Sequence, residues 1–176
     1  EGSKRLQQAG VDAITMADNS LASPRVSNLA LGAILKTQLS IEPLVHITCR
    51  DRNLLGQQSH LMGLHVLGIR QILIVSGDSP KLGDLPESSP VFDVTSFELI
   101  RKVKELNEGI AFSGKHFRHS ASFVIGAAFN PHVRKIESAI RRLEKKIEAG
   151  ADFVMTQPIY DEQGIEKLYH VTKHLP

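Results

Sequence analysis

The carboxylate of Asp78 is the side chain in this sequence that most clearly invites a chemical role. It follows the apolar run of residues 72–75 through Ser76 and Gly77. A carboxylate on a glycine turn at the end of a buried strand could stabilise a positive charge on a bound molecule. The segment Asp78-Ser79-Pro80 could equally begin a simple turn, because Asp, Ser and Pro are common turn residues. The residues alone leave both interpretations open.

Four other apolar runs also end in polar residues. The ends are residues 15–20, residues 48–52 with His46 inside the run before them, residues 128–131 and residues 156–161. Their hydroxyl, amide and imidazole groups suit a heteroaromatic ring, which presents both hydrogen-bond donors and acceptors. Parallel strands place their carboxyl ends on one rim, where ligands bind in α/β folds. The sequence therefore predicts a polar binding rim without naming its chemistry.

Each of these residues also has a purely structural interpretation. Asn19 and Asp51 could be helix caps. His46 could be a core histidine bonded to a backbone carbonyl, and Cys49 a small buried apolar residue. The basic stretch at residues 114–120 could attract a phosphate or could be a solvated excursion.

The strands that would position these residues are predicted by a recurring pattern. A helical segment ends in glycine and an apolar strand follows at once, at Gly10, Gly68 and Gly150. A glycine at this place suits the left-handed position that closes a helix. Residues 44–49 and 122–128 complete a set of five strands. Their nearly continuous apolar character is typical of parallel strands that are buried on both faces.

Helices are predicted between the strands. The pair Ser23-Pro24 is a good helix start, since proline fits the first helical turn. Thr95 and Glu98 fit a capping box, and Gly109 ends that helix. The clearest amphipathic pattern follows Pro131, with one apolar face formed by Ile136, Ile140, Leu143 and Ile147.

Strands that alternate with helices predict a parallel sheet with helices outside it. An open doubly wound sheet and a (β/α)8 TIM barrel both fit this order. None of the strands is followed by G-x-G-x-x-G, which weighs against a dinucleotide-binding Rossmann sheet. A whole barrel needs about 250 residues, so we expect residues 1–176 to form a single partial barrel domain with about five strands. Both ends read as cut helices, as in a piece of a larger chain.

Composition excludes several classes of protein. The net charge of +2 is too small to argue for nucleic acid or a membrane surface, and the sequence has no long apolar span and no signal peptide. A cytoplasmic location follows as the default. Cys49 is the only cysteine, so a disulfide framework and a cysteine-based zinc site are excluded. His60 and His65 are five residues apart and do not share a helix face, so we expect no metal site there.

Across nearly its whole length the chain resembles the methylenetetrahydrofolate reductase family. The segments that carry the resemblance are "DNSLASPRVSN", "VHITCRDRN", "GLHVLGIRQILIVSGDSP", "VFDVTSFELI", "FVIGAAFNP" and "RRLEKKIEAGADFVMTQPIYD". These segments are most similar to the sequences of the bacterial branch in which this domain is fused to a homocysteine S-methyltransferase domain.

The resemblance implies a (β/α)8 barrel that carries FAD along its strand ends. NADH or NADPH would reduce the flavin, which would then reduce 5,10-methylenetetrahydrofolate to 5-methyltetrahydrofolate in one-carbon and methionine metabolism. The small-molecule partners would be the folate and the nicotinamide, and a homo-oligomer is conceivable. The alternative is a folate- or pterin-binding barrel without redox activity, such as a methyltransferase domain. Such a barrel would bind folate without flavin.

The resemblance also implies roles for individual residues. Asp78 would be the catalytic carboxylate beside both flavin and folate, and Gln157 would contact the pterin. Asp78 would also contact the flavin. The other flavin-contacting residues would be Thr15, His46, Ser76, Gly77, Ala128, Asn130 and Lys146. Asn130 departs from the aromatic residue that some relatives carry. No residue in this chain matches the family's general acid, a glutamate at the end of the first barrel strand.

Overall fold

The structure is a computed structural model and describes residues 1–175. Its centre is one parallel sheet of five strands in the order β1-β2-β3-β4-β5. The strands are β1 (Ala13–Met16), β2 (Glu42–Thr48), β3 (Gln71–Val75), β4 (Val124–Phe129) and β5 (Phe153–Thr156). Every strand pairs with the next one along the chain. A doubly wound sheet would reverse its order at a switch point, so the fold is an incomplete (β/α) barrel, as predicted.

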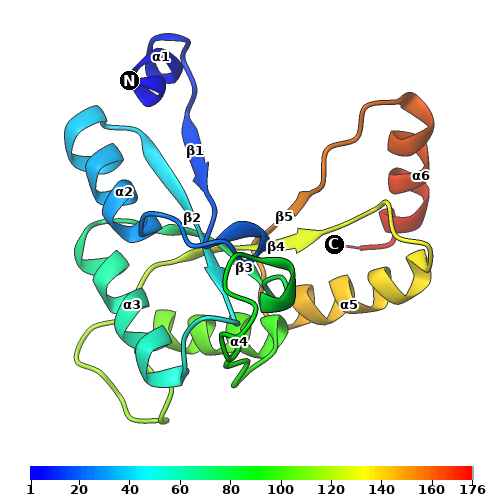
Figure 1. The fold of residues 1–176 in the computed structure, drawn as a ribbon. Helices are drawn as coiled ribbons and strands as arrows, with labels where there is room; N and C mark the ends of the chain where they lie inside the picture. Colours follow the sequence, from blue (N-terminus) through cyan, green and yellow to red (C-terminus); the bar gives the residue numbers. More distant parts are fainter. Residues whose placement is uncertain (176) are drawn as a thin grey trace.

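Six α-helices alternate with these strands within residues 1–175. They are α1 (Gly2–Gln8), α2 (Asn28–Ile34), α3 (Leu54–Val66), α4 (Ser96–Asn107), α5 (Ile136–Glu148) and α6 (Glu162–Thr172), with short turns η1 (Ser20–Ala22), η2 (Leu35–Leu39) and η3 (Pro80–Leu82). Helices α2 to α5 run along one side of the sheet, and no helix formed by residues 1–175 lies on the opposite side (Figure 1). None of the helices in the described part of the chain is both long and apolar enough to cross a bilayer.

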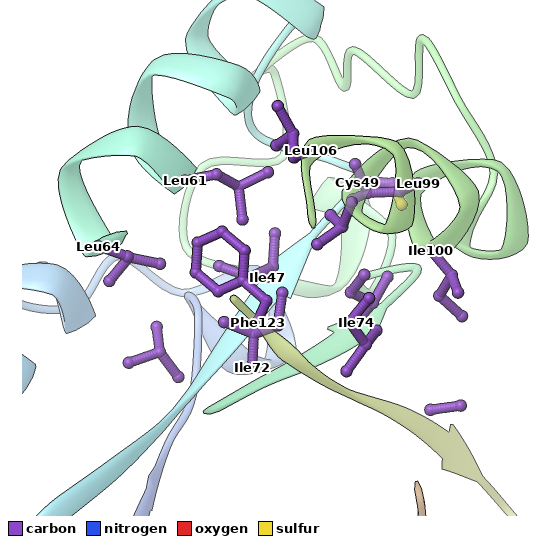
Figure 2. Packing of buried hydrophobic residues seen from close by; sticks show 14 of the residues in the cluster. Ile47, Cys49, Leu61, Leu64, Ile72, Ile74, Leu99, Ile100, Leu106 and Phe123 are labelled. Atoms are coloured by element: carbon purple, nitrogen blue, oxygen red, sulfur yellow. The ribbon is translucent and has the colours of Figure 1, made fainter. Parts of the chain in front are cut away.

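The main core lies between the sheet and helices α3 and α4 (Figure 2). Alternate strand residues point to opposite faces, and Ile47, Ile72 and Ile74 belong to this helix-side core. Cys49 lies there too, and burial raises the pKa of its thiol to about 12, so it is an inert apolar residue as the structural interpretation predicted. A second cluster forms where α5 packs on the end of β4; its buried members are Phe129, Ala139, Ile140 and Leu143.

The predicted helix boundaries are confirmed in most places. Gly10, Gly68 and Gly150 have φ values of +81°, +74° and +106°, the left-handed conformation expected after a helix. Thr95 forms the predicted capping box with Glu98, since each side chain accepts a hydrogen bond from the other residue's backbone amide. These local signals determine where each helix stops and the next strand begins.

The predicted helix start at Ser23-Pro24 is wrong, because α2 begins at Asn28. Contacts with polar side chains hold the preceding segment away from a helical path. Ser23 Oγ donates to Asp84 Oδ1 at 2.9 Å, and the backbone amide of Arg25 donates to Asn19 Oδ1 at 2.9 Å. Short polar side chains often compete with helix formation in this way.

The prediction that every strand is buried on both faces holds only for the middle of the sheet. Leu73 in β3 is 2% exposed although it faces the side without helices. Alternate residues of the edge strands β1 and β5 are more open, and Thr15 and Thr156 are exposed. Within the described chain each edge strand has a neighbour on one side only, which leaves these residues without cover.

Candidate active site

An ion pair between a partly buried arginine and a buried aspartate joins the carboxyl ends of β1 and β2. The Arg52 guanidinium donates from Nη1 to Asp18 Oδ2 at 2.7 Å and from Nη2 to Asp18 Oδ1 at 3.2 Å. Asp18 is 7% exposed, and its Oδ2 also accepts the backbone amide of Thr48 at 3.1 Å. Two parallel charge-assisted bonds fix orientation as well as distance, so this pair sets the relative position of the first two strand ends.

A second arginine, Arg50, joins three strand ends at once. Its side chain is 3% exposed and forms a salt bridge with Asp51, from Nε to Oδ1 at 2.5 Å and from Nη2 to Oδ2 at 2.9 Å. The same guanidinium donates to the backbone carbonyl of Asn19 at 3.0 Å and to that of Asp78 at 3.1 Å. The loops after β1, β2 and β3 therefore share one cation.

The Arg50–Asp51 pair is held in its charged form. The hydrogen bond to Asp51 raises the pKa of Arg50 against the effect of burial. Burial would raise the pKa of Asp51, but hydrogen bonds from Arg50 and Asn19 outweigh it and lower that pKa. The alternative interpretation of Asn19 and Asp51 as helix caps does not hold, since neither side chain caps a helix; Asn53 caps α3 instead.

Asp78 lies where the sequence predicted, exposed and just beyond β3. Its Oδ2 accepts the backbone amide of Leu21 at 2.9 Å, across 57 residues of sequence. This contact reaches the loop after β1, so the Asp78 side chain does more than form a local turn. The turn interpretation fits the residues that follow, because Ser79 precedes η3 and Pro80 is its first residue.

Thr15 and His46 meet on the side of the sheet without helices. The register pairs Thr15 with Leu44, which places it on the same face as His46. Thr15 Oγ1 and His46 Nε2 are 2.7 Å apart. The alternative interpretation, a histidine ring bonded to a backbone carbonyl, therefore does not hold. Burial lowers the pKa of His46, with Asp18 opposing the shift, so the ring is neutral at pH 7 and offers one donor and one acceptor.

The middle of the same face is formed by small and apolar residues. The register places Gly126 between Leu73 and Phe153. A β-carbon on Gly126 would lie 2.4 Å from Cζ of Phe153, so the phenyl ring rests directly on this glycine. Ala128, farther along β4, is half-buried. Ser76 is exposed just beyond the end of β3.

The ends of β4 and β5 hold the other predicted residues. Lys146 reaches from α5 and donates from Nζ to the backbone carbonyl of Ala128 at 2.7 Å. Burial, with repulsion from Arg142, lowers the pKa of Lys146. Asn130 Oδ1 accepts the backbone amide of His132 at 2.9 Å, a local turn. Gln157 is exposed, and its backbone amide donates to Phe129 at 2.9 Å.

A cavity of about 330 Å³ lies beside these two strand ends. His132 Nε2 and the carbonyl oxygen of Pro158 are 2.8 Å apart, which links the loops after β4 and β5. The cavity is lined by Pro131, His132, Val133, Ile136, Ile159, Asp161, Gln163, Gly164, Lys167, Leu168 and Val171. None of the predicted site residues lines it.

The predicted residues thus form two groups on one rim. Thr15, His46, Ser76, Gly77 and Asp78 belong to β1, β2 and β3 or to the turns after them, and Ala128, Asn130, Lys146 and Gln157 belong to the ends of β4 and β5 or reach them from α5. No hydrogen bond between the two groups is present among residues 1–175. A ligand that used both groups would have to span the rim.

Sequence reasoning missed Arg50, Asp18 and Leu21 as members of the site. The sequence places Asp18 and Arg50 at strand ends, but arginine and aspartate there are normally solvated. The signal that could have found them is the alternation of Arg50, Asp51 and Arg52 directly after a buried strand. Leu21 contributes only its backbone amide, which no side-chain pattern reveals.

The fold and rim together define a class: part of an α/β barrel with polar groups gathered at the carboxyl ends of its strands. The family model described as "Methylenetetrahydrofolate reductase" matches residues 1–174. The chain belongs to the methylenetetrahydrofolate reductase family.

Curated relatives agree with this assignment. "Methylenetetrahydrofolate reductase 1" of Schizosaccharomyces pombe is 27% identical over 132 residues, which cover 73% of this chain and 20% of the relative. "Probable methylenetetrahydrofolate reductase (NADPH)" of Caenorhabditis elegans is 25% identical over 142 residues, which cover 80% of this chain and 20% of that protein. The chain therefore spans about a fifth of the length of these relatives.

Solved structures show the likeness of fold alone. A crystal structure of 2,3-dimethylmalate lyase, a member of the PEP mutase/isocitrate lyase superfamily, matches with a TM-score of 0.64 at 15% identity. The match covers 99% of this chain and 60% of the lyase chain. The partial barrel is thus a known arrangement.

Proposed function

We propose that this chain is part of a flavin-dependent methylenetetrahydrofolate reductase that converts 5,10-methylenetetrahydrofolate to 5-methyltetrahydrofolate. Membership of the family supports the reaction. The observation that carries the proposal is the carboxylate of Asp78, exposed on the rim and held by a backbone amide rather than by a cation. FAD bound at this rim would supply hydride transfer between a reduced nicotinamide and the folate.

The residues present fit a flavin. A flavin ring is planar and needs both donors and acceptors at its polar edge. The hydroxyls of Thr15 and Ser76 and the neutral ring of His46 offer both kinds of group. Beside them Ala128 is half-buried and adds only a methyl group, while the phenyl ring of Phe153 covers Gly126. These residues, with Gly77 and Asn130, would hold the cofactor.

Asp78 would act on the folate. Methylenetetrahydrofolate must open to a cationic iminium before it can accept hydride, and a fixed carboxylate stabilises such a charge where water is excluded. A carboxylate already paired with a lysine or arginine would be less able to do so. In this structure the charged neighbour, Arg50, bonds to the carbonyl of Asp78 and leaves its carboxylate to the Leu21 amide.

Gln157 and Lys146 would hold the two ligands at the other strand ends. The exposed amide of Gln157 can donate and accept at once, as a pterin edge requires. Lys146 would have to exchange its bond to the Ala128 carbonyl for a phosphate or ribose oxygen of the cofactor. The name of the Caenorhabditis relative includes NADPH, which favours NADPH over NADH as the reductant. A fused homocysteine methyltransferase domain and self-association stay predictions.

The test is an anaerobic titration of the purified protein that carries this chain. We expect a yellow protein whose flavin absorbance bleaches with NADPH or NADH and returns when methylenetetrahydrofolate is added. A colourless protein that takes up no flavin on reconstitution would overturn the proposal. Folate binding without flavin would instead favour the non-redox pterin-binding barrel.

The variant Asp78→Asn tests the role of the carboxylate. It should keep FAD bound while slowing reoxidation by the folate about 100-fold, the usual effect of losing one electrostatic stabiliser. Reduction by the nicotinamide should change much less. Asp12→Asn, an exposed carboxylate just before β1, is the matched control and should alter neither half-reaction. Equal losses in both half-reactions of Asp78→Asn would contradict the assignment.

A further inference from the structure

The loops after β1, β2 and β3 meet at the buried guanidinium of Arg50. Two of its donors go to main-chain carbonyls, at Asn19 and at Asp78. Asn19 lies two residues before Leu21, whose amide holds the Asp78 carboxylate. Arg50 thus fixes the backbone on both sides of the Leu21–Asp78 hydrogen bond without touching the carboxylate itself.

The segment that supplies the Leu21 amide has an unfavourable backbone conformation. Asn19, Leu21 and Ala22 have φ values of +45°, +55° and +54°, although none is glycine. Such conformations persist only where surrounding contacts hold them, and they concentrate at functional sites. The Arg50 bond to Asn19 and the Asp78 bond to Leu21 are contacts of this kind.

Asp51 determines which groups the Arg50 guanidinium can contact, because it is the paired carboxylate of that arginine. Its two carboxylate oxygens occupy Nε and Nη2 of Arg50. An arginine without this partner would be free to turn its fork toward another carboxylate, because bidentate pairing is its preferred contact. Arg50 Nη1 already donates to the backbone carbonyl of Asp78 at 3.1 Å, so the guanidinium lies beside the residue that carries this carboxylate.

We propose that Arg50 is a positioning residue that holds the Asp78 carboxylate at the rim, and that Asp51 keeps Arg50 from pairing with it. The inference rests on the proposed function, in which Asp78 must be available to a cationic folate. Loss of Arg50 releases the Leu21 segment and misplaces the carboxylate. Loss of the Asp51 charge lets Arg50 capture the carboxylate.

The experiment compares Arg50→Met, Arg50→Lys and Asp51→Asn in the protein that carries this chain. The first readout needs no cofactor: amide hydrogen exchange at Leu21, relative to global stability measured by urea unfolding. We expect Arg50→Met and Asp51→Asn to speed exchange at Leu21 by about tenfold beyond any global change. Arg50→Lys, which keeps the charge but loses the fork, should lie between Arg50→Met and the wild type.

The second readout is the pair of half-reactions. Misplacement of a catalytic group by about 1 Å costs roughly 100-fold, so folate-dependent reoxidation in Arg50→Met should fall by about 10- to 100-fold while flavin content and nicotinamide oxidation stay close to wild type. Arg70→Met is the matched control, because Arg70 also donates to backbone carbonyls but lies before β3, at the other end of the strands.

The two readouts separate the outcomes. Unchanged exchange at Leu21 in Arg50→Met, or equal effects on exchange from Arg70→Met, would overturn the positioning role. Equal slowing of both half-reactions would overturn it as well. A protein that binds no flavin would refute the proposed function, while the exchange measurement would still decide whether Arg50 holds Asp78.

Discussion

Gly77 and Arg50 are in such close contact that a β-carbon on Gly77 would lie 3.0 Å from Cβ of Arg50. Gly77 also has a φ of +91°, a backbone conformation that is unfavourable for residues with a β-carbon. The turn before Asp78 therefore needs glycine for two independent reasons, and one of them is the buried arginine.

We predict that Gly77→Ala destabilises the fold by about 2–3 kcal/mol, from backbone strain together with the contact to Arg50. Gly114→Ala is the control, because Gly114 has a φ of +83° and nothing within 4 Å of its β-carbon position. It should cost only about 1 kcal/mol. Urea unfolding of both variants measures the difference, and equal costs would show that the contact with Arg50 is unimportant.

The ion pair of Asp18 and Arg52 leads to a second prediction. Asp18→Asn should cost about 2–4 kcal/mol, because it leaves a partly buried guanidinium without its counter-ion. Glu144→Gln removes the same charge from the exposed Glu144–His174 pair and should cost less than about 1 kcal/mol. Chemical denaturation checks both values. Similar small costs would mean that water replaces the lost carboxylate at Asp18.

The contact between Gly126 and Phe153 can be tested with a double-mutant cycle. Gly126→Ala should cost about 2–3 kcal/mol, since the new methyl group meets the phenyl ring. Adding Phe153→Ala should make room for that methyl group, so the double variant should be more stable than the sum of the two single costs by about 1–2 kcal/mol. Strict additivity would place the ring elsewhere.

The partly buried side chain of His60 leads to a prediction about how the stability of the fold depends on pH. Burial and repulsion from Arg52 lower the pKa of His60 to about 4, with Asp18 opposing them. As the pH falls below 6.5, this histidine takes up a proton in the unfolded chain before it does so in the folded chain. The free energy of unfolding therefore decreases as the pH falls, until the folded chain is also protonated at about pH 4. The loss from this one residue should reach roughly 3 kcal/mol.

The free energy of unfolding measured between pH 7 and pH 4 tests this prediction. His60→Gln should flatten the pH dependence, whereas His119→Gln, at an exposed histidine in the loop before β4, should leave it unchanged. Burial also lowers the pKa values of His46 and His65, so a reduced slope should remain in His60→Gln. A slope identical to wild type would assign the effect to those other histidines.

Much of the barrel could be predicted because its signals are local. Apolar runs, the helix-ending glycines and the Thr95 capping box each depend on a few adjacent residues, and the structure has them where the sequence places them. The start of α2 was predicted wrongly because Ser23 and Arg25 bond to Asp84 and Asn19 instead of a helix. Asp84 is 61 residues away from Ser23 in the sequence, so a local pattern does not contain this competing contact.

The candidate site also contains some features that the sequence predicts and others that depend on how distant segments meet. The exposed residues at strand ends, Asp78 and Gln157 among them, follow from strand boundaries alone. The burial of Arg50 does not, because it requires three loops to converge on one guanidinium. The Leu21 amide was equally hidden, since its role comes from a backbone conformation that leucine rarely adopts.

The strictly sequential pairing of the strands has a consequence for how the chain acquires its structure. Each strand pairs with the strand that precedes it in the chain, so the sheet can grow in the order of synthesis. The Arg50 guanidinium has all of its hydrogen-bond partners once residue 78 has left the ribosome. The Asp78 end of the rim can therefore be complete on a nascent chain while Gln157 is still unmade.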